Sequence, residues 1–233
     1  MHYDIHELES ILYLISNISN NHHRSSFFFD KIKKIIILIK DEIKHTFSNI
    51  EIFNIFKDNK RILLLLINED ILTFDSTIMS KINYFEDYFY TEIAKLNEKA
   101  IEIPENYEEK RLKGENDLYL CELIRNDNIE EFIILHNKNS FSLSMVIQNS
   151  IYETNSILYK KAATLIEYTA FYGSIQIFRY LIQNQVELTP SLYLYSIHSQ
   201  NPEILHILEE NQICPNDKSY QECLKESIKC HHN

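Results

Sequence analysis

Apolar residues along this chain recur every three or four positions, which is the spacing of a helix with one buried face. The same spacing recurs along most of the first ninety residues, at Ile5, Leu8, Leu12 and Ile15, at Ile32, Ile35, Ile36 and Ile39, at Ile50, Phe53 and Phe56, at Ile62, Leu63, Leu66 and Ile67, and at Ile78, Ile82, Phe85 and Phe89. Strict alternation of apolar and polar residues, which is typical of strands, is nearly absent. The pattern therefore predicts an all-α protein.

Four helix starts are predicted by capping boxes, in which Ser or Thr is followed three residues later by Glu. The hydroxyl accepts a hydrogen bond from the third helical amide, and the carboxylate accepts one from the amide of the capping residue. The four pairs are Ser48 with Glu51, Ser150 with Glu153, Thr164 with Glu167, and Ser219 with Glu222. So many starts in one chain predict many short helices.

The stretch from Lys99 to Asp117 differs from the rest of the chain. It contains Pro104, Gly114 and a run of charged residues at 108–111, and its apolar periodicity fades. We expect a linker here, with a boundary near residue 112. This divides the chain into an N-terminal helical region with degenerate repeats (1–112) and a second domain (113–233). The alternative is a long connection inside one array of repeats.

An internal repeat lies in the second half of the chain. Residues 164–186 recur with a shift of 27 positions. The shift pairs Thr164, Leu165 and Tyr168 with Ser191, Leu192 and Tyr195. It also pairs Gln176, Ile177 and Phe178 with Glu203, Ile204 and Leu205. Finally, it pairs Leu181, Asn184 and Val186 with Leu208, Asn211 and Ile213. Weaker copies begin at Leu118 and Ile55, and residues 220–233 look like the first half of another unit. We therefore expect a repeat array that ends mid-repeat.

This unit resembles the ankyrin repeat, T-P-L-H-x-A-A-x-x-G-x-x-E-x-V-x-x-L-L-x-x-G. The register holds without a gap at Thr164, Ile166, Ala170, Gly173, Gln176, Phe178, Leu181 and Ile182. More closely, the chain is similar to the Asn- and Ile-rich ankyrin-like proteins of parasitic protists, which carry a divergent ankyrin domain of unknown function. The similar stretches begin at Thr164 (T-L-I-E-Y) and at Asn201 (N-P-E-I).

The chain departs from the ankyrin pattern in several places. Leu165 replaces the Pro and Glu167 replaces the His of T-P-L-H, so a capping box takes the place of that hydrogen-bond network. The Gly that follows the second helix becomes Gln185 and Gln212, and we expect the neighbouring Asn184 or Asn211 to adopt the left-handed conformation instead. The spacing of 27 residues, against about 33 in ankyrin repeats, predicts shortened or absent β-fingers.

The resemblance implies an all-α solenoid that serves as a scaffold for protein–protein interaction, without catalysis or cofactor. Phe171 and Tyr172, with His198 and Ser199 in the next unit, occupy positions that face the concave side of ankyrin repeats, so they are candidates for binding the partner. The alternative is that the aromatic rings pack against neighbouring helices. The residues expected to maintain the repeat are Thr164, Glu167, Ala170, Gly173, Leu181, Ser191 and Leu208.

Composition and charge narrow the classes of function. Ile is abundant at 37 residues while Val occurs twice, and two glycines are too few for a phosphate-binding loop or a dinucleotide fingerprint. The net charge of -11 argues against binding nucleic acid or an anionic membrane surface. The N-terminus does not resemble a signal peptide and no apolar run is long enough to span a bilayer. We expect a cytoplasmic monomer that binds a protein partner and keeps its four cysteines reduced.

The Cys- and His-rich C-terminus offers one alternative chemistry. Cys223, Cys230, His231 and His232 supply sulfur and nitrogen ligands, but Cys223 and Cys230 are two helical turns apart, about 10 Å. Zinc ligands usually come in closer pairs, so we predict no metal site. Catalysis by Cys230 with the two histidines would lack a pre-organised pocket. A metal-dependent or enzymatic regulator that uses these residues remains the alternative function.

Overall fold

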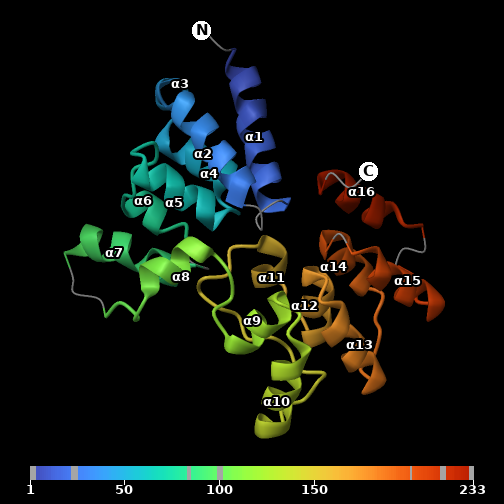
Figure 1. Cartoon of the computed structure of the whole chain (residues 1–233). Coiled ribbons are helices and arrows are strands. Elements are labelled where there is room, and N and C mark those ends of the chain that lie inside the picture. The colour runs from blue at the N-terminus through green and yellow to red at the C-terminus, as the bar shows by residue number, and fades with distance from the viewer. Residues whose placement is uncertain are drawn as a thin grey trace. The chain divides into compact units, whose positions relative to one another are not determined.

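The computed structural model describes residues 4–21, 26–82, 85–98, 102–199, 201–215 and 219–230. Within these ranges the chain forms sixteen α-helices, one 3-10 helix and no strand (Figure 1). One isolated antiparallel bridge joins Val146 and Thr164. The prediction of an all-α protein is confirmed, and its arrangement as a solenoid stays a prediction.

The chain folds into two compact units, each with its own hydrophobic core. The first unit contains residues 1–115 together with the returning segment 151–156. The second unit contains residues 116–150 and 157–233. The first unit is therefore built from two separate stretches of sequence.

The first unit packs its longer helices around a core rich in Ile, Leu and Phe. Its α-helices are α1 (Ile5–Asn21), α2 (Ser26–Leu38), α3 (Lys40–Thr46), α4 (Asn49–Phe56), α5 (Lys60–Asn68), α6 (Ser76–Met79), α7 (Tyr90–Asn97) and α8 (Tyr107–Lys113). Helix α1 packs against α2 and α4, and α4 packs against α5. Most of the apolar positions that predicted these helices lie in this core, but Ile5 and Ile35 are 48% and 44% exposed.

Two expectations for this unit need correction. The apolar positions from Ile78 to Phe89 do not form one helix, because α6 ends at Met79 and the chain turns before the 3-10 helix η1 (Glu86–Phe89). The stretch predicted as a linker contains helix α8, which ends at Gly114 in the left-handed conformation. Periodicity fades in α8 because its buried positions include a charged residue, Arg111.

The second unit contains α9 (Tyr119–Arg125), α10 (Ile129–Asn139), α11 (Ser156–Lys160), α12 (Leu165–Tyr172), α13 (Ile175–Gln183), α14 (Leu192–Ser199), α15 (Pro202–Glu210) and α16 (Gln221–Lys229). Helices α9, α12, α14 and α16 pack side by side in that order. Helices α10, α13 and α15 pack on one another in the same way, so these seven helices form two layers (Figure 1).

Two successive helix pairs in this unit have matching lengths. Helices α12 and α14 each have eight residues, and α13 and α15 each have nine. Helix α14 begins at Leu192, 27 residues after α12 begins at Leu165, and α15 follows α13 at the same offset. The sequence shift therefore coincides with the helix boundaries.

The two pairs also end alike. The amide of Val186 donates to the carbonyl of Leu181 at 3.1 Å, and the amide of Ile213 donates to the carbonyl of Leu208 at 3.0 Å. In both turns the residue before the donor is left-handed, Gln185 with φ 62° and Gln212 with φ 57°.

The expectation that an Asn carries the left-handed conformation is wrong. Asn184 and Asn211 keep φ at -91° and -85°. Each instead donates from its side-chain amide to a carbonyl four residues back, that of Tyr180 at 2.8 Å and that of Ile207 at 2.7 Å. This bond holds each Asn at the end of its helix, so the turn falls on the glutamine that follows.

Two of the four predicted capping boxes form. The Glu51 carboxylate accepts from the Ser48 amide at 2.8 Å before α4, and the Glu167 carboxylate accepts from the Thr164 amide at 2.8 Å before α12. The other two predictions are wrong. Ser150 precedes a turn and bonds Asp117, and α16 starts after Tyr220, one residue beyond Ser219.

Candidate metal centre

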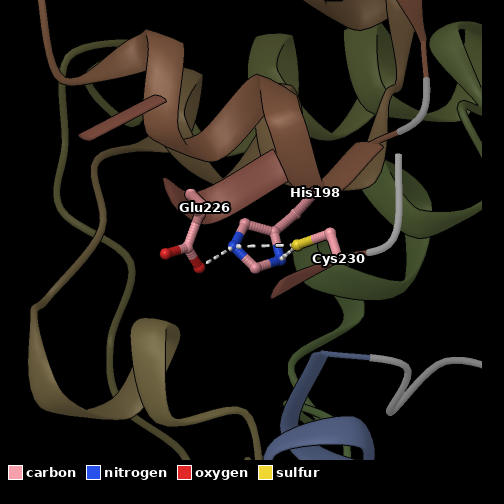
Figure 2. Close-up of side chains that lie close together, drawn as sticks. All are labelled: His198, Glu226 and Cys230. Carbon is pink, nitrogen blue, oxygen red and sulfur yellow. Dashed lines mark hydrogen bonds and ion pairs between the residues drawn. The ribbon is translucent and has the colours of Figure 1, made fainter. Parts of the chain in front are cut away.

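Three side chains with metal-binding atoms meet between α14 and α16. His198 lies in the last turn of α14, Glu226 lies on α16, and Cys230 is the residue that ends α16. Glu226 and Cys230 are four residues apart, so they share one face of the helix. Because α14 and α16 pack against each other, that face meets His198 (Figure 2).

The three groups are close enough to interact directly. His198 Nε2 lies 2.9 Å from Glu226 Oε1. Cys230 Sγ lies 3.5 Å from His198 Nδ1 and 4.0 Å from His198 Nε2. One ligand atom from each of the three residues lies within 4.8 Å of the others, the only such group of three or more among the described residues.

The cluster is largely shielded from water. The His198 side chain is 2% exposed and that of Glu226 is 14% exposed, while Cys230 is 2% exposed. The imidazole stacks on the Phe171 ring with centroids 5.0 Å apart. Charges in such a place interact more strongly than they do on the surface.

Burial and hydrogen bonding give the acid and the thiol opposite states. The hydrogen bond with His198 lowers the pKa of Glu226 to about 2 in spite of burial, and the nearby Lys229 ammonium adds to the effect. Burial raises the pKa of the Cys230 thiol to about 12, with a further contribution from the charge of Glu226. At neutral pH the carboxylate is therefore ionised and the thiol keeps its proton.

This arrangement permits two kinds of chemistry. A thiol beside an imidazole that is held by a carboxylate is the order found in cysteine nucleophiles. The thiolate is the reactive form, however, and a buried thiol with a raised pKa is poorly suited to attack a substrate. Nitrogen, oxygen and sulfur donors that lie within 4.8 Å of one another in a shielded place instead match the ligands of a divalent ion such as zinc.

The sequence-predicted partner-binding residues lie mostly inside the second unit. Phe171 is fully buried, Tyr172 is 5% exposed and His198 is 8% exposed as a whole residue. Ser199 is partly exposed and donates to the carbonyl of Ser196 at 2.6 Å. A contact with a partner requires exposure that Phe171, Tyr172 and His198 do not have, because the aromatic rings pack against neighbouring helices.

The residues expected to maintain the repeat hold helices together. Ser191 Oγ donates to Glu167 Oε1 at 2.6 Å, which links the start of α14 to the capping box of α12. Gly173 is left-handed at φ 73°, and an added Cβ would lie 3.1 Å from Cβ of Ser199. The apolar members are fully buried at Ala170, Leu181 and Leu208.

The sequence predicts no metal site, and of the three clustered residues only Cys230 is among its candidate ligands. Of the other candidates, Cys223 is not in the cluster, and His231 and His232 lie outside the described residues. The spacing of Glu226 and Cys230 was visible in the sequence. Their meeting with His198 depends on the packing of α14 against α16.

Comparison with protein-family models, curated proteins and solved structures finds no match to this chain. The resemblance to ankyrin repeats therefore stays a prediction that rests on residues and helix boundaries. Within the described part of the chain, no helix combines the length and apolar character needed to cross a bilayer.

Proposed function

We propose that this chain is a scaffold for protein–protein interaction, and that its second unit is a stack of divergent ankyrin-like helix pairs. The observation that supports this most is the repetition of a helix pair. Helices α12 and α13 are followed 27 residues later by α14 and α15, with the same lengths and the same terminal hydrogen bonds. Stacked pairs of this kind bury a continuous core and present an extended surface.

Hydrogen bonds between successive pairs support the same proposal. Besides the bond from Ser191 to Glu167, the Asn201 side chain donates to the carbonyl of Gly173 at 3.0 Å. The Asp127 carboxylate, which precedes α10, accepts from the amides of Gln176 and Ile177 at 3.0 and 3.1 Å. Such bonds fix one pair relative to the next, which favours a rigid recognition surface over a flexible one.

The surface available for recognition lies on the second layer of helices. Helices α12 and α14 are buried along almost their whole length. Helices α13 and α15 expose polar and charged side chains, and Arg179 on α13 forms an ion pair with Glu203 on α15. The exposed positions on these two helices include Gln176, Arg179, Gln183, His206, Glu209 and Glu210. We place the partner-binding surface there.

A charge reversal on this surface tests the proposal. The variant Arg179→Glu with His206→Glu changes exposed positions of α13 and α15, so helical content should be unchanged. Lys34→Glu with His45→Glu is a matched control on exposed positions of the first unit. Proteins captured by the wild-type chain from lysate of the source organism are expected to remain with the control and to fall by about tenfold or more with the variant.

Direct binding decides the outcome. Each captured protein is purified and titrated with the three chains by calorimetry. A partner that binds the wild type and the control but not the α13/α15 variant supports the proposal. Equal binding to all three chains, or capture of chaperones alone, contradicts a recognition surface on these helices.

A further inference from the structure

We propose that His198, Glu226 and Cys230 bind one divalent cation of the zinc class, and that this ion fastens α16 to α14. The inference goes beyond the scaffold function and does not depend on it. It rests on three donor atoms of different elements that lie within 4.8 Å of one another in one shielded place. The scaffold function alone gives no reason for this combination.

The separations of the donor atoms suit a tetrahedral ion. Bonds of about 2.0 to 2.3 Å at tetrahedral angles hold ligand atoms roughly 3.3 to 3.6 Å apart. His198 Nε2 is 2.9 Å from Glu226 Oε1 and 4.0 Å from Cys230 Sγ, one a little shorter and one a little longer than this. Cys230 Sγ lies nearer to His198 Nδ1, at 3.5 Å, so the thiol must move toward the Nε2 side of the ring before all three donors can share one ion.

The donor set selects the class of ion. Calcium and magnesium require several oxygen ligands, and the cluster offers oxygen from one carboxylate only. Nitrogen and sulfur donors favour zinc and its neighbours among the transition metals. A bound cation would also replace the proton of the Cys230 thiol, since thiols coordinate as thiolates.

Neighbouring groups already orient two of the ligands. The Lys229 ammonium lies 2.8 Å from Glu226 Oε2 and leaves Oε1 directed at His198. The Phe171 ring stacks on the imidazole and limits its rotation. Supporting contacts of this kind are typical of metal sites, where they position the ligands.

The ion would add to the packing that already holds α16 on α14. Within this helix and its last residue, Cys223 and Cys230 are the buried positions, whereas Leu224 and Ile228 are 60% and 64% exposed. An ion that binds only the folded chain stabilises it in proportion to the logarithm of its concentration. We therefore expect zinc to raise the melting temperature of the full chain.

The experiment uses the full chain, freed of metal by a chelator and then titrated with Co²⁺. Coordination of cobalt by a thiolate produces a charge-transfer absorption that reports sulfur ligation. We expect saturation at one Co²⁺ per chain and displacement by Zn²⁺. His198→Asn and Glu226→Gln are expected to weaken binding by more than about 100-fold, since loss of an outer supporting group alone costs 10- to 100-fold.

Replacement of the sulfur separates ligation from folding. Cys230→Ser is expected to abolish the absorption and the rise in melting temperature caused by zinc. Cys230→His keeps a ligand at this position, so it is expected to bind Co²⁺ without the charge-transfer band. Retention of helical content in both chains, checked by circular dichroism, shows that loss of the band does not arise from unfolding.

Control variants cover the other candidate ligands. Cys214→Ser removes an exposed thiol and Cys223→Ala removes a buried one, and both are expected to keep the band. Absence of micromolar binding in the wild type, or a band that persists in Cys230→Ser, would overturn the proposal. So would a band that is lost in His231→Asn with His232→Asn and retained in His198→Asn. None of these results depends on protein recognition by α13 and α15.

Discussion

Both glycines of this chain stand where a helix ends in the left-handed conformation. Gly114 ends α8 at φ 68° and Gly173 ends α12 at φ 73°. Gln185 and Gln212 adopt the same conformation after α13 and α15. A side chain with a Cβ costs roughly 1–2 kcal/mol in this region. The two glutamines therefore carry strain at the position where the ankyrin pattern has glycine.

Relief of this strain gives a prediction at the residue scale. We expect Gln212→Gly to stabilise the folded chain by about 0.5–1 kcal/mol, because glycine adopts positive φ without the Cβ penalty but loses more backbone entropy. Urea denaturation followed by circular dichroism measures the change. Gln185→Gly should behave in the same way.

The control is the preceding residue. Asn211→Gly changes a position with φ -85° and removes the side-chain bond to the carbonyl of Ile207, so it is expected to destabilise the chain. A shift of the urea midpoint in the same direction for Gln212→Gly and Asn211→Gly would contradict the assignment of the left-handed conformation to Gln212 alone.

Helices α7 and α8 are joined by a buried ion pair. Arg111 Nη1 donates to Glu92 Oε2 at 2.7 Å, with side-chain exposures of 4% and 7%. Burial acts to lower the pKa of Arg111, but the hydrogen bond and charge of Glu92 outweigh it and raise that pKa. Arg111 also contacts Glu108, whose side chain is 57% exposed. The two acids therefore bond the same guanidinium in different surroundings.

This contrast gives a prediction at the element scale. Glu92→Ala is expected to destabilise the first unit by about 3–5 kcal/mol, because it leaves the Arg111 charge buried without its main partner. Glu108→Ala is the matched control and should cost less than about 1 kcal/mol, as expected for a pair with one exposed member. Thermal denaturation of both variants checks the difference, and equal losses would contradict the assignment of Glu92 as the main partner.

At the scale of the whole molecule, the first unit depends on a segment that returns from far along the chain. Lys60 Nζ donates to the carbonyl of Glu153 at 3.0 Å, and Thr154 Oγ1 donates to the carbonyl of Gly114 at 2.7 Å. Lys60 also lies 5.6 Å from the Tyr88 ring centroid. Burial lowers the pKa of Lys60 to about 8, although the Glu153 carboxylate opposes the shift.

The lowered pKa predicts how stability depends on pH. Between about pH 8 and pH 10.5 the unfolded chain keeps the Lys60 proton and the folded chain loses it, so Lys60 makes the fold more stable as pH rises through this window. The gain across the window is about 3 kcal/mol, because the pKa falls from 10.5 to about 8 and one pKa unit corresponds to about 1.4 kcal/mol. Lys60→Met removes this contribution.

The measurement is the free energy of unfolding of both chains at several pH values. Other groups titrate in the same window, so the difference between wild type and Lys60→Met is the quantity of interest. The free energy of unfolding of the wild type should rise relative to that of Lys60→Met from pH 8 to pH 10.5. A constant difference across the window would show that Lys60 is not desolvated in the folded chain.

Much of the helical content could be predicted from local sequence. The capping box at Thr164, the apolar spacing in α12 to α15 and the 27-residue shift all describe contacts between residues close along the chain. The predictions from sequence fail where a contact with an element far along the chain determines the local structure. The segment at Ser150 matches the pattern of a capping box. Glu153 belongs to the first unit, however, and its carboxylate accepts a hydrogen bond from the Asn155 amide at 2.8 Å.

The all-α class, the positions of many helices and the offset between two helix pairs follow from the amino-acid sequence, because backbone hydrogen bonding and apolar periodicity act within a few residues. Which side chains are accessible, and which of them contact one another, follows from the packing of the helices. Phe171 became a buried partner of His198, and His198 met Glu226 and Cys230 from 28 and 32 residues away. Such meetings depend on how helices pack, and spacing along one helix does not encode that.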